Sequence, residues 1–161
     1  MPEVYHETLE NSRVNQKEEK DQNESITKRG HLHNQLGLMR SKQKKFGPAI
    51  AQFKESRKLD GKQPVMLNAY AQALLTSNDP AIVDNSLALK LAQQACVLTR
   101  HKNPVYMGTL AVAYAAVENL IEAEEISKKA LQLAMATGDR DLIAKQQRQL
   151  SLIRGALARP K

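Results

Sequence analysis

The chain has no tryptophan and few aromatic residues, which restricts how its interior is built. Of its 161 residues, 42% are hydrophobic but only 4% are aromatic. The core must therefore consist mainly of alanine, leucine, isoleucine and valine, and small alanine side chains let helices approach closely. Seven glycines and six prolines are few for the many tight turns of a β-sandwich. The composition favours stacked helical hairpins, in one domain by length.

Cysteine is equally scarce. The single cysteine, Cys96, excludes an intramolecular disulfide and a cysteine-based metal site. It follows Ala92 and Ala95 in an apolar helical run. We expect a small buried hydrophobic residue there and not a reactive thiol.

The motifs of common active sites are absent from the sequence. It contains no glycine-rich phosphate loop and no GxSxG, HExxH or CxxC motif. His31 and His33 are two residues apart, so on a helix they point to different sides and cannot share a metal ion. Glu124 and Glu125 precede Lys128 and Lys129 by four residues, which indicates ion pairs on a helix face. We expect no catalytic residue, no cofactor and no metal site, and therefore no enzyme.

Sequence signals for membranes are also missing. The first ten residues, MPEVYHETLE, lack the basic and apolar regions of a signal peptide. No run of 18 apolar residues is long enough for a transmembrane helix. We expect no membrane insertion and a cytoplasmic location, an expectation that an upstream segment of a longer protein would change.

The clearest structural pattern in the sequence lies in residues 103–133. Leu110 and Tyr114 mark one helix, and Ala123 and Ala130 mark a second, with small residues where two helices must touch. Asn119 lies in the turn between them, where the left-handed backbone region is expected. The stretch predicts a helical hairpin.

The same pattern occurs twice upstream. Its residues in the first copy are Leu36, Gly37, Phe46, Ala49 and Phe53, and in the second Leu67, Tyr70, Ala71, Leu74, Ala88, Ala92 and Ala95. The step from Gly30 to Pro64 is 34 positions, whereas the step from Pro64 to Pro104 is 40, so the second copy carries a turn-rich insertion of six. Gly61 is expected to provide a left-handed helix cap before Pro64.

Three such copies in register resemble the tetratricopeptide repeat. The resemblance implies an all-α, right-handed α-solenoid of three hairpins and a C-terminal capping helix. The expected boundaries are an arm, flexible or loosely helical, at 1–30, repeats at 31–63, 64–103 and 104–137, a capping helix at 139–156 and a tail at 157–161. Within the first repeat the helices are expected at 31–43 and 47–59. The second repeat is also similar to terminal repeats of bacterial members of the family.

The capping helix is expected to cover the end of the solenoid. Its predicted apolar face consists of Leu142, Ile143, Leu150, Leu152 and Ile153, and its polar face of Gln146, Gln147, Arg148 and Gln149.

In this family the first helix of each repeat lines a concave groove that binds partners. Matched by register, the resemblance places the groove at His31, Asn34, Leu38, Ser41, Lys42, Val65, Asn68, Gln72, Leu75, Thr76, Val105, Gly108, Val112, Ala115 and Ala116. We select Asn34, Leu38, Lys42, Asn68, Gln72, Val105 and Val112 as the predicted partner-binding residues. For Val105, Val112 and Ala116, packing beneath the last helix or the arm stays an equal alternative.

Some members of the family bind the C-terminal carboxylate of chaperones through lysine, arginine and asparagine side chains. At four of those positions this sequence has Leu38, Ala69, Val105 and Thr109. We therefore expect no chaperone-tail clamp. The groove changes from polar in the first repeat to apolar in the third, which suits a peptide with an apolar end.

The distribution of charge along the chain is compatible with more than one class of partner. Residues 1–30 hold seven acids and five bases, and residues 31–161 hold ten acids and nineteen bases, giving net charges of −2 and +9. The favoured function is a non-catalytic adaptor that binds a protein or peptide, acidic around an apolar segment. The alternatives are a nucleic-acid-associated adaptor that uses the basic patches, and an accessory segment of a larger enzyme. Self-association also stays open.

Overall fold

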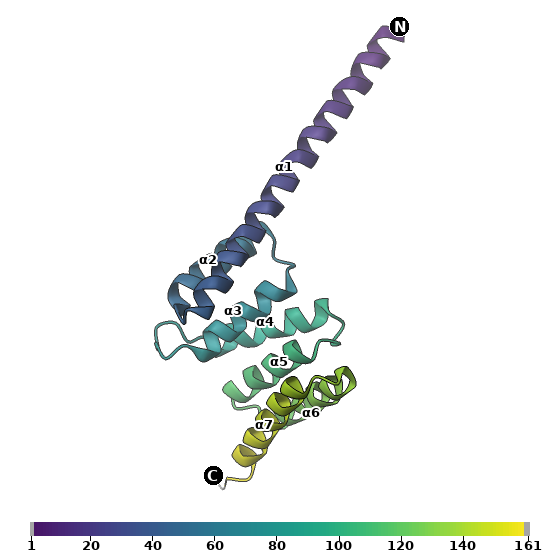
Figure 1. Ribbon diagram of the computed structural model, residues 1–161. Helices are drawn as coiled ribbons and strands as arrows, with labels where there is room; N and C mark the ends of the chain where they lie inside the picture. Colours follow the sequence, from purple (N-terminus) through teal and green to yellow (C-terminus); the bar gives the residue numbers. More distant parts are fainter. Residues whose placement is uncertain (1, 160–161) are drawn as a thin grey trace.

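The computed structural model describes the backbone of residues 2–159 and the side chains of residues 10–159 (Figure 1). Within that range it contains helices and no strands. The helices are α1 (Pro2–Lys42), α2 (Phe46–Leu59), α3 (Pro64–Thr76), α4 (Asn85–Leu98), α5 (Pro104–Ala116), α6 (Leu120–Thr137) and α7 (Arg140–Leu157). Helix α1 packs against α2, α3 against α4, α5 against α6, and α7 against α6. The predicted all-α solenoid of three hairpins and a capping helix is confirmed.

The helix starts follow from local sequence. Pro64 and Pro104 occupy the first turns of α3 and α5, where a missing N–H has no helical partner to lose. The Asn103 side chain accepts hydrogen bonds from the first turn of α5, and Asp84 and Asp139 cap α4 and α7 in the same way. Each cap satisfies backbone N–H groups that the helix itself leaves unpaired.

Two turn predictions are wrong. Gly61 does not adopt positive φ, and the glycine that does is Gly138, at the end of α6 (φ 72°). In the turn before α6 the left-handed residue is Glu118 (φ 62°), because Asn119 is used as the helix cap. An asparagine suits either position, since its short side chain both tolerates left-handed backbone and caps helices.

The core between the first two hairpins centres on Phe53. This ring is fully buried and stacks on the ring of Tyr70 from α3, with centroids 5.9 Å apart. Its other neighbour is Gly37 of α1, where an added Cβ would lie 2.5 Å from a Phe53 ring carbon. The glycine therefore permits the close approach of α1 and α2 around the ring.

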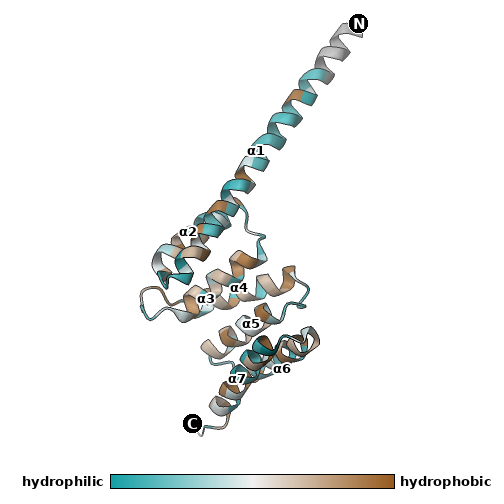
Figure 2. Cartoon of the chain, in the orientation of Figure 1, coloured by the Kyte–Doolittle hydropathy of each residue, from teal (hydrophilic) through white to brown (hydrophobic). Residues whose placement is uncertain are grey.

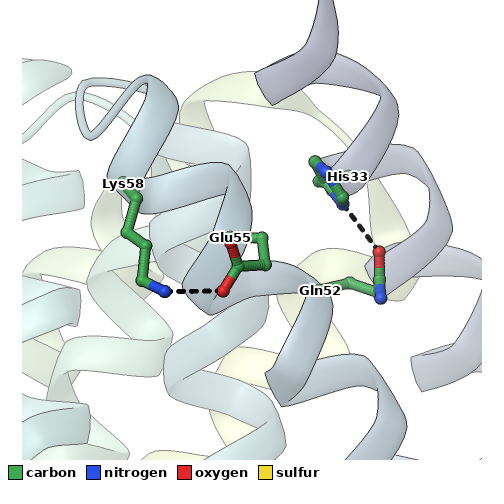
Figure 3. Close-up of polar contacts among 4 residues, drawn as sticks. All are labelled: His33, Gln52, Glu55 and Lys58. Carbon is green, nitrogen blue, oxygen red and sulfur yellow. Dashed lines mark hydrogen bonds and ion pairs between the residues drawn. The ribbon is translucent and has the colours of Figure 1, made fainter.

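Polar contacts also join α1 to α2. The Ser56 hydroxyl donates a buried hydrogen bond of 2.8 Å to the Gly30 carbonyl. His33 Nδ1 and Gln52 Oε1 lie 2.8 Å apart across the same helix pair (Figure 3). His31 is exposed to solvent, whereas His33 is half-buried between α1 and α2.

The structure differs from the prediction at the start of the chain. The first helix does not begin near His31 but is continuous from Pro2, and it extends well beyond the solenoid (Figure 1). Residues 10–29 are all exposed, and Figure 2 shows polar residues around most of this segment. The packed part of α1 supplies the nucleus, and propagation then costs little because no proline or glycine interrupts residues 3–29.

Removal of residues 2–27 is expected to leave the folding of the solenoid unchanged. Since the side chains of residues 10–27 are exposed, their loss removes no core packing, and the thermal midpoint should stay within about 2 °C. Circular dichroism melting of the full and shortened chains measures this. A clearly lower midpoint, or new binding of a hydrophobic dye, would show that the segment covers the solenoid.

Replacing Gly37 by alanine is expected to destabilise the fold. The new methyl group meets a buried ring that is held by Tyr70, and such overpacking costs about 1–3 kcal/mol. Denaturant unfolding measures the change. Gly155→Ala is the matched control, because a Cβ at this helical glycine meets nothing within 4 Å, and there alanine should stabilise by roughly 0.5–1 kcal/mol. Equal stability of the two variants would contradict the role assigned to Gly37.

Candidate partner-binding groove

The concave side of the solenoid contains an open cavity of about 280 Å³ between α3, α5 and α7. Three of the predicted groove residues, Gln72, Val105 and Val112, line it. The full lining consists of Gln72, Leu75, Thr76, Val105, Gly108, Thr109, Val112, Lys145, Gln146 and Gln149. Amide and aliphatic groups predominate, and Lys145 is the one charged side chain in this lining.

Hydrogen bonds fix the floor of the cavity. Gln72 Nε2 donates to Thr109 Oγ1 at 3.1 Å, and the Thr109 hydroxyl lies 3.2 Å from the Val105 carbonyl, to which it donates. The first of these bonds ties α3 to α5, and the second lies within α5. The position of Gln72 is therefore set before any partner binds.

Helix α7 forms the opposite wall through two glutamines. Gln146, only 1% exposed, donates to the Pro104 carbonyl at 3.3 Å, and Gln149 Nε2 donates to the Gly108 carbonyl at 2.6 Å. Gly108 leaves room for the Gln146 side chain, because a Cβ at this position would lie 2.6 Å from the Gln146 amide nitrogen. Gln146 Oε1 accepts no hydrogen bond within the described part of the chain.

The predicted faces of the capping helix are wrong at two positions. Gln146, expected on the polar face, is buried, and Leu152, expected on the apolar face, is 75% exposed. The helix is rotated so that Gln146 reaches backbone carbonyls of α5, while Leu150 and Ile153 are buried. Backbone acceptors make a buried amide favourable, and a pattern of hydrophobic residues carries no information about them.

Helix α7 covers the apolar groove residues only in part. Val105 is half-buried in the cavity that α7 helps to form, whereas Val112, in the same cavity, is 38% exposed. Packing beneath the last helix thus accounts for part of the environment of Val105 and leaves Val112 open.

The other predicted groove residues lie outside this cavity. Asn34 is buried and donates to Gln63 Oε1 at 3.1 Å, and Asn68 is also buried. Leu38 packs against the core, and Lys42 is exposed at the end of α1. The amide oxygens of both asparagines accept no hydrogen bond from the residues described. The structure thus separates a cavity between α3, α5 and α7 from Asn68 of the second hairpin and from the predicted positions in the first.

An ion-pair cluster lies between α6 and α7. Glu124 binds Lys128 at 2.9 Å, which confirms one of the two predicted pairs, and Arg154 of α7 binds the same carboxylate at 2.9 Å. The other predicted pair, Glu125 with Lys129, is not among the ion pairs of the described residues. Hydrogen bonds from Lys128 and Arg154 hold the pKa of Glu124 below its usual value. Among residues 10–159 no three potential ligands gather as a metal ion would need.

We compared the chain with family models, curated proteins and solved structures. No family model matches the sequence, and no curated protein matches it. Several solved structures do match. The first TPR domain of Spaghetti (RPAP3), bound to an HSP90 peptide, superposes with a TM-score of 0.67 at 20% identity, covering 83% of this chain and 96% of that one.

Two further structures agree. The Sgt2 TPR domain from Aspergillus fumigatus gives a TM-score of 0.65 at 18% identity, covering 82% of this chain and 85% of that one. PcrH in complex with the chaperone binding region of PopD gives 0.64 at 18% identity, covering 78% and 91%. The chain has the tetratricopeptide-repeat fold. Similarity at this level of identity shows the fold alone and does not bear on the resemblance to bacterial repeats.

Within the repeat fold no described helix is both long and apolar enough to cross a membrane. The long helix α1 is polar along most of its length (Figure 2).

The thiol of Cys96 is expected to be unreactive in the folded protein. The side chain is fully buried, and this burial raises its pKa to about 11. At pH 8 the nucleophilic thiolate is therefore scarce and inaccessible. A chromogenic disulfide reagent should detect one thiol only after denaturant is added. Rapid reaction without denaturant would show that α4 opens to solvent.

Proposed function

We propose that this protein is a non-catalytic interaction module that binds a segment of a partner protein in the concave groove. The observation that carries the proposal is the open cavity between α3, α5 and α7, which is built from three separate helices and held by hydrogen bonds. We propose that it acts in the cytoplasm, as the sequence led us to expect.

The lining fits a peptide better than a small charged metabolite. Leu75, Val105 and Val112 offer apolar contact, and the exposed Thr76 hydroxyl offers a polar group beside them. Pockets of this kind combine apolar area with a few fixed polar groups that set the ligand's orientation. We propose that an apolar side chain of the partner enters the cavity and that its backbone continues along Asn68, Asn34 and Leu38.

Similar structures support peptide binding but not the same peptide. The Spaghetti domain was solved with the HSP90 peptide SRMEEVD, and the second TPR domain of human RPAP3 with an HSP70 peptide. In this chain Leu38, Ala69, Val105 and Thr109 occupy the positions of the carboxylate clamp. We therefore propose a partner with an internal apolar segment, whose acidic flanks are attracted by Lys145 and by Lys42 at the far end of the groove.

Affinity capture tests this proposal. The full chain is used as bait at low and high salt, with and without nuclease. Proteins that bind in the concave groove should survive both treatments and be lost from Gln72→Ala/Val112→Asn. The matched control is Gln147→Ala/Leu152→Asn, which makes the same chemical changes on the exposed side of α7, and it should retain them.

The remaining outcomes distinguish the alternatives. Complete loss with nuclease would point to the basic patches and nucleic acid. Equal loss from both double variants would show a surface effect unrelated to the groove. Capture of the untagged chain itself would indicate self-association.

A further inference from the structure

A second groove lies on another part of the solenoid and shares no residue with the concave cavity. It has a volume of about 460 Å³ and runs between the end of α2, the loop before α3 and the length of α4. We name it the α4 groove. Its main exposed lining residues are Arg57, Lys62, Lys90, Gln94, Val97 and Leu98.

The α4 groove is lined by positive charges that no carboxylate in the lining balances. Arg57, Lys62 and Lys90 line it, no carboxylate does, and none of the three forms an ion pair within the described residues. The neighbouring Lys58, by contrast, binds Glu55 at 2.7 Å (Figure 3). Three unpaired cations around one concave surface create a local potential that attracts acidic groups.

The nearest acids on the adjoining elements are engaged in local structure. Asp60 accepts a hydrogen bond from the backbone N–H of Lys62 at 3.1 Å, and Asp84 accepts one from the first turn of α4 at 2.8 Å. Neither lines the α4 groove. Their carboxylates form no ion pair with Arg57, Lys62 or Lys90.

One end of the α4 groove is apolar and open. Val97 is 63% exposed and Leu98 is 43% exposed, in the last turn of α4. No aromatic side chain among residues 10–159 lines this groove, so bases would have no ring there to stack on. A nucleic acid would satisfy the cations but would place phosphates against Val97 and Leu98.

We propose that the α4 groove binds an acidic amphipathic segment of a partner protein, separate from whatever occupies the concave groove. Acidic side chains of the segment face Arg57, Lys62 and Lys90, and a large apolar side chain covers Val97 and Leu98. From Leu87 to Leu98 the helix measures about 17 Å at 1.5 Å per residue. A helical segment of about three turns matches that length.

Selection from a displayed library of random 12-residue peptides tests the proposal, with the full chain as target. The enriched peptides should include a class that combines several acidic residues with large apolar ones. Synthetic peptides of that class should lose at least about tenfold in affinity for Arg57→Glu/Lys62→Glu/Lys90→Glu, since attraction becomes repulsion. They should also weaken on Val97→Ser/Leu98→Ser.

Two controls assign the effect to this groove. Lys129→Glu/Arg140→Glu/Arg148→Glu changes the net charge equally at exposed positions of α6 and α7 and should leave binding intact. Gln72→Ala/Val112→Asn alters the concave groove and should also leave it intact. All exchanged residues of the α4 groove and of the charge control are exposed, and circular dichroism verifies that each variant is folded.

Four results would overturn the proposal. The first is the absence of an acidic and apolar class among the enriched peptides. The second is equal loss of binding on the charge control, which would show non-specific attraction. The third is tighter binding of a 20-nucleotide DNA duplex than of any peptide, abolished by the Arg57, Lys62 and Lys90 reversal. Peptides lost only on Gln72→Ala/Val112→Asn would support the concave groove and overturn the α4 groove.

Discussion

The packing of Phe53 between Gly37 and Tyr70 is the contact on which the rest of the solenoid depends. It joins α1 to α2 within the first hairpin and, through the stack on Tyr70, joins that hairpin to the second. In a repeat architecture each unit contacts only its neighbours, so stability passes along the chain through such interfaces. The direction of α1, and with it the long polar helix beyond the solenoid, follows from this one close approach.

The last hairpin is completed by a different kind of contact. Gln146 and Gln149 of α7 donate to backbone carbonyls of α5, and Gly108 leaves the space they need. The end of the solenoid is therefore covered by hydrogen-bonded amides as well as by Leu150 and Ile153. One consequence is a concave cavity whose lining combines amide groups with aliphatic side chains.

The two grooves differ in chemistry and in position. The concave cavity has a single charged lining residue, Lys145, whereas the α4 groove combines three unpaired cations with exposed Val97 and Leu98. A net charge of +7 spread over the surface would not by itself distinguish them. The distinction arises because carboxylates on the elements beside the α4 groove are engaged locally. Glu55 binds Lys58, and Asp60 and Asp84 accept hydrogen bonds from backbone N–H groups. The two surfaces that we propose for partner binding therefore differ in the charge of their linings.

The sequence by itself determined the helical hairpins, their order and most helix starts, because Pro64, Pro104 and Asn103 act within a few residues of their own position. It also indicated Gln72, Val105 and Val112 as groove residues, through the spacing of the repeat. Only the tertiary structure decided that α7 buries Gln146 and exposes Leu152, since the partners of Gln146 lie about 40 residues away in the chain. The α4 groove likewise brings together Arg57 and Lys90, and no local pattern shows that two distant cations face one hollow without a carboxylate between them.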